Sequence, residues 1–373
     1  MNTLPAALAA AALALPLAAS AEEPLPRTRI TSYGEIVYAR PLDSAKDAAA
    51  DLRRLVIGLE RPFDASTELV VELEVEHAVT SADDAGEVAV EQAYVERRLG
   101  DVLTARAGLL LVPMGFLNRS HEPTAFLGVN RTLVETAIVP TTWREGALAL
   151  SAALPGAVTV QAGLTTGFDV GAWDATSPEG QESPLASIHQ ELQLAKAHDA
   201  SGFLAVDWRG APGLHVGGSA FAGGVSQGQP GVPRSSLLLW DLHARWSPGR
   251  LDLAAMFARG TFSNTRRLNL PLVGSPTLVP EAFDGWYAQA AYRVWEREGM
   301  AATPFARVER VNTGRSYADL GAGLTPAGRP TETVVTAGAS LHLSPEVVVK
   351  ADWQRYEVDG PRTAVNVGLG WAF

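Results

Sequence analysis

The chain has 373 residues, no cysteine and a formal net charge of −11, from 30 Lys and Arg against 41 Asp and Glu. The acidic excess argues against nucleic acid as a partner, because nucleic-acid binding needs a basic surface. Without disulfides, a chain of this size needs a large hydrogen-bonded framework if it is exported, and a closed sheet supplies one.

Residues 1–21 have the features of a secretory signal peptide. An Ala- and Leu-rich block ends in Ala19, Ser20 and Ala21, a small-x-small pattern that suits signal peptidase. No Lys or Arg precedes the block, so only the free amino terminus supplies positive charge there. The alternative is a single membrane anchor, but the block is shorter than the ~20 residues that span a bilayer. We expect cleavage before Glu22 and a mature domain over residues 22–373.

From residue 29 onward, apolar side chains alternate with polar or small ones, which is the period of a strand with two unlike faces. No later stretch approaches the ~18 uncharged apolar residues of a membrane-spanning helix. About sixteen strands are predicted, an even number, at 29–40, 51–61, 66–78, 87–99, 102–111, 144–153, 156–167, 200–209, 213–224, 236–247, 250–262, 284–296, 301–312, 330–343, 345–357 and 362–373.

The connections between these segments alternate in length. Long ones lie at about 112–143, 168–199, 225–235, 263–283 and 313–329, and the intervening links are short and rich in Pro, Gly and charged residues. Transmembrane β-barrels have short turns at one end and longer loops at the other, whereas a soluble β protein has no reason to sort its loops in this way. The pattern predicts an all-β, antiparallel, up-and-down transmembrane barrel.

One long connection contains a predicted helix. Over Pro184–His198, the apolar residues Leu185, Ile188, Leu192 and Leu194 lie near helical spacing. We expect this helix to pack over the barrel as part of a lid.

The strands also predict which side chains face the barrel lumen. In residues 66–78, Glu68, Glu72, Glu74 and Glu76 share one face, and a dry core could not hold such a row of carboxylates without a large cost. In a membrane barrel the apolar face contacts lipid and the polar face lines the lumen. The predicted lumen-facing residues are Arg54, Glu60, Glu72, Glu74, Glu96, Arg98, Arg106, Asp241, Arg245, Arg293, Arg307 and Glu309.

Four short runs lie close together between residues 115 and 146: GFLNRSHEP from Gly115, GVNR from Gly128, VET from Val134 and PTTWREG from Pro140. They resemble the motifs of a proteobacterial outer-membrane porin family within the phosphate-selective porin superfamily. The resemblance is specific from about residue 29 to 170 and architectural beyond. A last strand that ends on Phe373 also looks like the signal by which the outer-membrane assembly machinery recognises its clients.

The resemblance implies that the connection 112–143 folds into the barrel as a constriction loop. Arg and Glu on facing walls would set a transverse field that sorts permeants by charge. A loop inside a lumen also needs charged pairs and hydrogen bonds simply to stay there, so both roles remain open. On the matching positions, the residues that shape the constriction or anchor the loop are His121, Glu122, Arg131, Glu135, Arg144 and Glu145.

We therefore expect a bacterial outer-membrane porin, a water-filled channel for passive diffusion of small hydrophilic solutes and ions. The alternative is a substrate-selective anion channel of the phosphate type on the same fold. The phosphate-selective members have a ladder of basic side chains, whereas this chain has three lysines. The resemblance further implies a homotrimer in contact with outer-membrane lipid and lipopolysaccharide.

No arrangement of catalytic or metal-ligating residues stands out. The chain has no cysteine and no Gly-rich phosphate loop, and neither His121 nor His243 has metal-ligand spacing. An outer-membrane hydrolase could use Gln289, His243 or Ser340, but no spacing singles them out. We expect no enzyme activity, no cofactor and no metal site.

Overall fold

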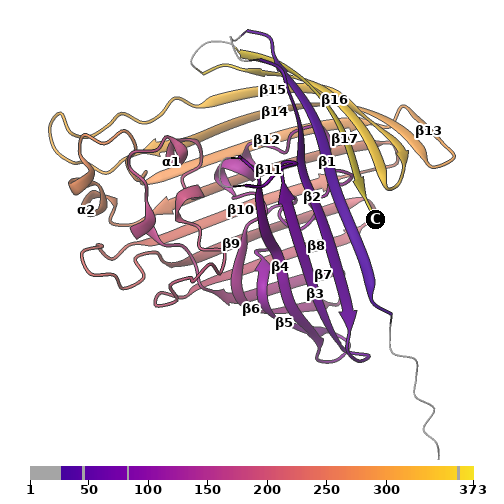
Figure 1. Ribbon diagram of the computed structural model, residues 1–373, viewed down its shortest axis with the longest axis horizontal. Helices are drawn as coiled ribbons and strands as arrows, with labels where there is room; N and C mark the ends of the chain where they lie inside the picture. The colour runs from indigo at the N-terminus through magenta and orange to yellow at the C-terminus, as the bar shows by residue number, and fades with distance from the viewer. Residues whose placement is uncertain (1–26, 44–46, 82–83, 359–361) are drawn as a thin grey trace, which may run out of the picture.

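The computed structural model describes residues 27–43, 47–81, 84–358 and 362–373. The predicted signal peptide lies outside these residues. The described strands form one antiparallel sheet in which each strand pairs with its neighbours in sequence, and the last strand pairs with the first. The sheet is therefore closed into a barrel (Figure 1).

The strands are β1 (Arg29–Pro41), β2 (Ala49–Pro62), β3 (Thr67–Glu76), β4 (Glu87–Arg98), β5 (Leu103–Leu111), β6 (Arg144–Leu154), β7 (Val158–Thr165), β8 (Ser201–Ala211), β9 (Leu214–Gly224), β10 (Ser236–Trp246), β11 (Leu251–Phe262), β12 (Ala282–Tyr292), β13 (Trp295–Arg297), β14 (Met300–Ser316), β15 (Glu332–Ser344), β16 (Val347–Tyr356) and β17 (Arg362–Ala372). Because β12 and β13 both pair with β14 and follow one another along it, they form one interrupted barrel strand. The predicted barrel of sixteen antiparallel strands is confirmed.

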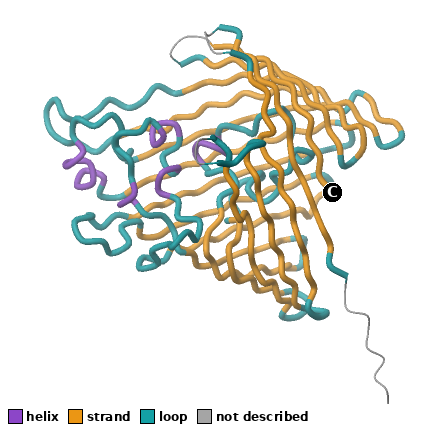
Figure 2. Tube along the Cα trace, viewed as in Figure 1, coloured by secondary structure: helices purple, strands orange, loops and turns teal. Residues whose placement is uncertain are grey.

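The long connections and the short helices gather at one end of the barrel, and tight turns join the strands at the other (Figure 2). The helical segments are η1 (Val134–Ile138), η2 (Val170–Ala172), α1 (Glu179–Glu182), η3 (Ala186–Ile188), α2 (Thr265–Asn269) and η4 (Leu270–Leu272). Among the described residues, no helix is long and apolar enough to cross a membrane.

The predicted helix over Pro184–His198 is wrong. Only the single turn η3 forms, and Glu191, Leu192 and Leu194 have positive φ, which a right-handed helix does not allow. The Gln190 side chain bonds to the backbone of Lys196 in both directions and so closes a loop in place of a helix. Leu194 is 99% exposed, so the apparent helical spacing reflected no common buried face.

Strand β10 shows why these sequences form a barrel wall. Leu238 and Leu242 are exposed on the outer face, while Leu239, Asp241 and His243 are buried on the inner face. Exposed leucines, valines and tryptophans recur on the outer face of strands around the barrel. An apolar exterior of this kind is what a lipid environment requires.

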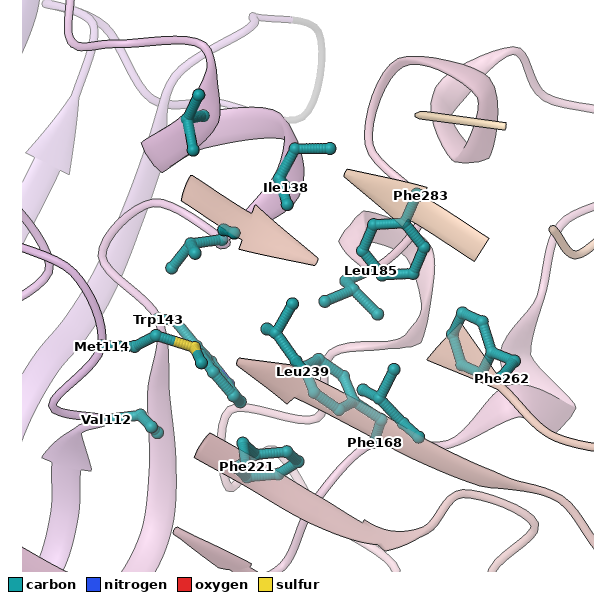
Figure 3. Close-up of a cluster of buried hydrophobic side chains, with 14 of the residues drawn as sticks. Val112, Met114, Ile138, Trp143, Phe168, Leu185, Phe221, Leu239, Phe262 and Phe283 are labelled. Carbon is teal, nitrogen blue, oxygen red and sulfur yellow. The ribbon is translucent and has the colours of Figure 1, made fainter. Parts of the chain in front are cut away.

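The barrel interior is not polar throughout. Inward-facing side chains of β9 to β12 meet side chains from the long connections in a buried apolar cluster (Figure 3). Trp143 stacks on Phe168 with ring centroids 5.1 Å apart, and both rings contact Phe221 from the wall. Because the folded loops exclude water here, apolar residues replace the polar ones expected on the inner face. Part of the lumen is therefore filled by protein.

Candidate functional site

Residues 112–143 connect β5 to β6 and fold into the barrel, where η1 contacts β11, β12 and β14 on another part of the wall. Asn118 closes the base of this loop. Its side-chain amide donates to the carbonyls of Val112 and Trp143 and accepts from the Trp143 amide at 2.6 Å. The Trp143 amide finds its acceptor here, while the two carbonyls also accept from the backbone amides of Met114 and Val112.

Glu135 is buried at the centre of the loop. One carboxylate oxygen accepts from the backbone amides of Phe116 and Leu117, each at 2.7 Å, and the other accepts from Tyr287 of β12 at 3.1 Å. Burial raises the pKa of the Glu135 carboxyl above its usual value. The side chain thus joins two parts of the loop to the barrel wall.

Arg131 and His121 hold the other side of the loop. The Arg131 guanidinium donates to the His121 carbonyl at 3.1 Å and to the Thr142 hydroxyl at 2.9 Å, and burial lowers the pKa of Arg131 to about 10. The His121 imidazole Nε2 lies 2.5 Å from Glu91 Oε1 on β4 and 2.7 Å from the Tyr33 hydroxyl on β1. This part of the loop is tied to the wall by a buried polar network.

Wall residues also bind the loop backbone directly. Asp352 of β16 accepts from the Val129 amide at 2.6 Å, and Glu309 of β14 accepts from the Leu133 amide at 2.6 Å. The Lys350 ammonium lies 3.6 Å from the ring centroid of Phe126. The loop is therefore held from both sides of the barrel.

Arg144 and Glu145 begin β6, directly after the loop. Glu145 is fully buried and accepts from the Trp143 indole at 3.0 Å and the Thr166 hydroxyl at 2.8 Å. Arg144 donates to Glu191 of the next long connection at 2.8 Å. Both side chains link neighbouring loops.

Glu122 has a different environment. It lines a pocket of about 250 Å³ together with Glu72, Arg106, Arg119 and His121. Within the described part of the chain, its carboxylate makes no hydrogen bond or ion pair. A second pocket, of about 310 Å³, lies between loop residues 124–127 and charged side chains that include Arg245 and Arg293.

Half of the residues predicted to face the lumen pair with one another, and the others pair with further residues of the barrel and its turns. Arg54 lies 3.3 Å from Glu35 and 3.6 Å from Glu74, and Arg307 lies 2.8 Å from Glu309. The remaining contacts are Arg106 with Glu96, Arg245 with Asp252, Asp241 with His243, Glu72 with Gln92, Glu60 with Arg29, Arg293 with Glu296, and Arg98, which is exposed, with the Ala65 carbonyl.

Sequence reasoning missed several of these groups. Asn118 lies inside the GFLNRSHEP run, but it is uncharged and was not among the charged residues singled out there. Asp352 lies more than 200 residues from the loop that it binds. Asp207 and His215, which approach His243 in the barrel wall, have no motif spacing that could have identified them.

The run Gly224–Gly228 has the Gly-x-Ser-x-Gly spacing of a catalytic serine motif. A nucleophile elbow joins a strand to a helix, whereas this run begins at the last residue of β9 and continues into the connection to β10. The Ser226 hydroxyl donates to the Pro233 carbonyl at 2.9 Å and accepts from the Ser235 amide at 2.7 Å. Ser226 therefore closes a loop, and the absence of enzyme activity stays a prediction.

Comparison with known proteins gives the fold without a family. No protein-family model matches the chain. An uncharacterized protein of Aquifex aeolicus is 26% identical over 358 residues, which cover 92% of this chain and 79% of that protein.

Solved outer-membrane proteins share the architecture at low identity. OmpF of Salmonella typhi, in complex with daunomycin, superposes with a TM-score of 0.64 at 12% identity over 93% of this chain and 97% of that chain. OprB of Pseudomonas putida gives 0.58 at 12% identity over 93% and 94%, and an anion-selective porin from Comamonas acidovorans gives 0.55 at 12% identity over 93% and 100%. The chain thus has the fold of outer-membrane porins.

Proposed function

We propose that this chain is a bacterial outer-membrane porin with weak charge selectivity, through which small hydrophilic solutes and ions diffuse passively. The observation that carries the proposal is the loop of residues 112–143 inside a closed barrel, with polar pockets of about 250 and 310 Å³ beside it. The apolar outer face supports a membrane location, because such a surface would aggregate in water.

The contacts support an anchoring role for five of the six residues singled out in the sequence. His121, Arg131, Glu135, Arg144 and Glu145 are each buried and bonded to a wall or a neighbouring loop. Glu122 faces a pocket instead. We assign the control of permeant charge to Glu122, because the basic residues that share its pocket, Arg106 and Arg119, are paired with Glu96 and Asp207.

The runs between residues 115 and 146 support placement in the phosphate-selective porin superfamily. A phosphate-selective channel, however, needs cationic groups that are free to meet the permeant. Arg54, Arg106, Arg245 and Arg307 each lie beside a carboxylate. Local neutralisation therefore favours a general porin over the phosphate-type alternative.

Planar-bilayer recording of the refolded mature chain tests the function. We expect stable conductance steps and a small reversal potential under a salt gradient. Absence of channels from correctly folded protein would refute the porin proposal. A strongly anionic reversal potential with block by phosphate would instead establish the phosphate-type channel.

We also propose a homotrimer surrounded by lipid and lipopolysaccharide. One solved neighbour, OmpT of Vibrio cholerae, is described in a trimer form and superposes with a TM-score of 0.53. Light scattering in mild detergent should give three times the mass of one chain. A monomeric mass with full channel activity would contradict this proposal.

A further inference from the structure

Three neighbouring strands each contribute one side chain with a metal-ligating atom to the same point of the barrel wall. The residues are Asp207 of β8, His215 of β9 and His243 of β10, and their ligand atoms lie within 4.8 Å of one another. Asp207 Oδ1 is 2.6 Å from His215 Nε2 and 3.3 Å from His243 Nε2. Two imidazole nitrogens and one carboxylate oxygen therefore converge.

The strand register explains this convergence. Asp207 and His243 both lie opposite Gly217 of β9. His215 precedes Gly217 by two residues in β9, so its side chain is on the same face of the strand. A Cβ at Gly217 would lie 2.4 Å from His243 Nε2 and 2.7 Å from Asp207 Oδ1. Only glycine therefore leaves the space in which the imidazole and the carboxylate meet across the central strand.

A second carboxylate orients His243. Asp241 Oδ1 lies 2.6 Å from His243 Nδ1, so that nitrogen keeps its proton. His243 Nε2 donates to Asp207 Oδ1, and it is the nitrogen that a metal ion would bind once this proton is lost. Histidines that bind metals almost always donate their other nitrogen to a carboxylate, carbonyl or water in this way. The Gly115 amide of the loop donates to the other Asp241 oxygen at 3.3 Å and helps to fix its position.

The surroundings leave one route to the cluster. Arg119 donates to Asp207 Oδ2 at 2.9 Å and leaves Oδ1 directed at the two histidines. The Phe116 ring packs against both imidazoles in edge-to-face geometry, with centroids 5.4 Å from His215 and 4.5 Å from His243. The side chains of Asp207 and His243 are 2% and 3% exposed, whereas that of His215 is 16% exposed, so access is past His215.

We propose that Asp207, His215 and His243 form a binding site for a divalent transition-metal ion of the Zn²⁺ class, a departure from the expectation of no metal site. Imidazole and carboxylate ligands suit zinc, which takes three protein ligands and one open position in its reactive sites. Bonds of about 2.0–2.2 Å in tetrahedral geometry place ligand atoms roughly 3.4 Å apart. The Asp207–His243 distance of 3.3 Å already matches. His215 Nε2, which is 2.6 Å from Asp207 Oδ1, would have to move away from that oxygen to admit the ion.

The competing interpretation is a hydrogen-bonded His–Asp–His network that serves only to hold the wall and the loop together. Isothermal titration calorimetry of the refolded chain, prepared without a histidine tag and titrated with Zn²⁺, distinguishes the metal site from the hydrogen-bonded network. We expect one saturable site per chain and, with Co²⁺, the intense visible absorption of a tetrahedral centre. No saturable binding by the folded wild-type barrel would overturn the proposal.

Variants locate the site. His215→Gln, at the partly exposed strand end, should weaken Zn²⁺ binding at least tenfold while leaving the barrel folded. Asp241→Asn keeps all three ligands but alters the group that orients His243, and it should weaken binding about 10–100-fold. His198→Ala is the matched control, because His198 also lies 2.8 Å from an aspartate, Asp199, but at an exposed position outside the cluster. Equal binding by wild type and His215→Gln, or loss of binding in His198→Ala, would refute the assignment.

Discussion

Glu122 and Glu135 show how two acidic side chains of one loop acquire different roles. Glu122 lines the pocket of about 250 Å³, whereas Glu135 is buried among backbone amides. Their sequence context indicated that both belong to the loop, but a single sequence does not show which carboxylate meets water. Glu135 is buried because it bonds to Tyr287 and to the Phe116 amide, and these contacts form only when the loop has folded into the barrel.

We predict that Glu122→Gln shifts the reversal potential of the channel toward anions, because it removes a negative charge that faces water. Glu135→Gln should leave the reversal potential unchanged. The effect of Glu122→Gln should shrink in concentrated salt, since the screening length falls from ~10 Å at 0.1 M to ~3 Å at 1 M. Recordings at both salt concentrations test this, and equal shifts from the two variants would contradict the assignment.

A second prediction concerns the anchoring role of Glu135. Glu135→Ala leaves the amides of Phe116 and Leu117 without an acceptor, at a cost of about 1–3 kcal/mol for each buried group. Glu135→Gln keeps one carbonyl oxygen for them. We expect noisier and larger conductance steps in Glu135→Ala only. Steps of wild-type size and noise in Glu135→Ala would show that the loop is held without this residue.

At the scale of elements, the strands were predictable because each has two unlike faces, and alternation is visible in a single sequence. The segment over residues 184–198 was not, because its structure depends on the side-chain contacts of Gln190 and on burial of Leu185 and Ile188 against distant loops. The spacing of apolar residues in such a loop does not reveal these contacts with distant residues. The apolar patch inside the barrel was missed for the same reason, since it forms only when the connections fold inward.

The seam between β1 and β17 gives a prediction at this scale. Gly34 lies opposite Trp371, and a Cβ at Gly34 would be 2.5 Å from the Trp371 ring and 2.8 Å from the Arg54 carbonyl. Gly34→Ala should therefore destabilise the barrel by about 1–3 kcal/mol, as overpacking typically does. Gly202→Ala is the matched control, because the nearest atom to a Cβ there is 3.6 Å away. Urea unfolding followed by tryptophan fluorescence measures both, and equal midpoints would argue against a tight seam.

At the scale of the whole molecule, strand number, loop parity and the outer apolar face were all accessible from the sequence, because a membrane barrel imposes them along the entire chain. The cluster of Asp207, His215 and His243 was not accessible, because it depends on the exact register of three strands. Register is set by pairing, and a shift of one residue would turn each side chain to the other face. The architecture therefore follows from the sequence pattern, whereas a site inside the wall depends on how the strands pair.

The closed sheet leads to the last prediction, which concerns the behaviour of the intact barrel. A sheet whose last strand pairs with its first has no free edge at which unfolding can start. The protein should fractionate with the outer membrane, begin at Glu22, and migrate faster in detergent gels before boiling than after it. Gly34→Ala should lower the temperature at which the slow form appears, while Gly202→Ala should not. Recovery of the folded protein from the soluble periplasm would contradict both the membrane location and the channel function, because the exposed leucines and tryptophans of the wall would then face water.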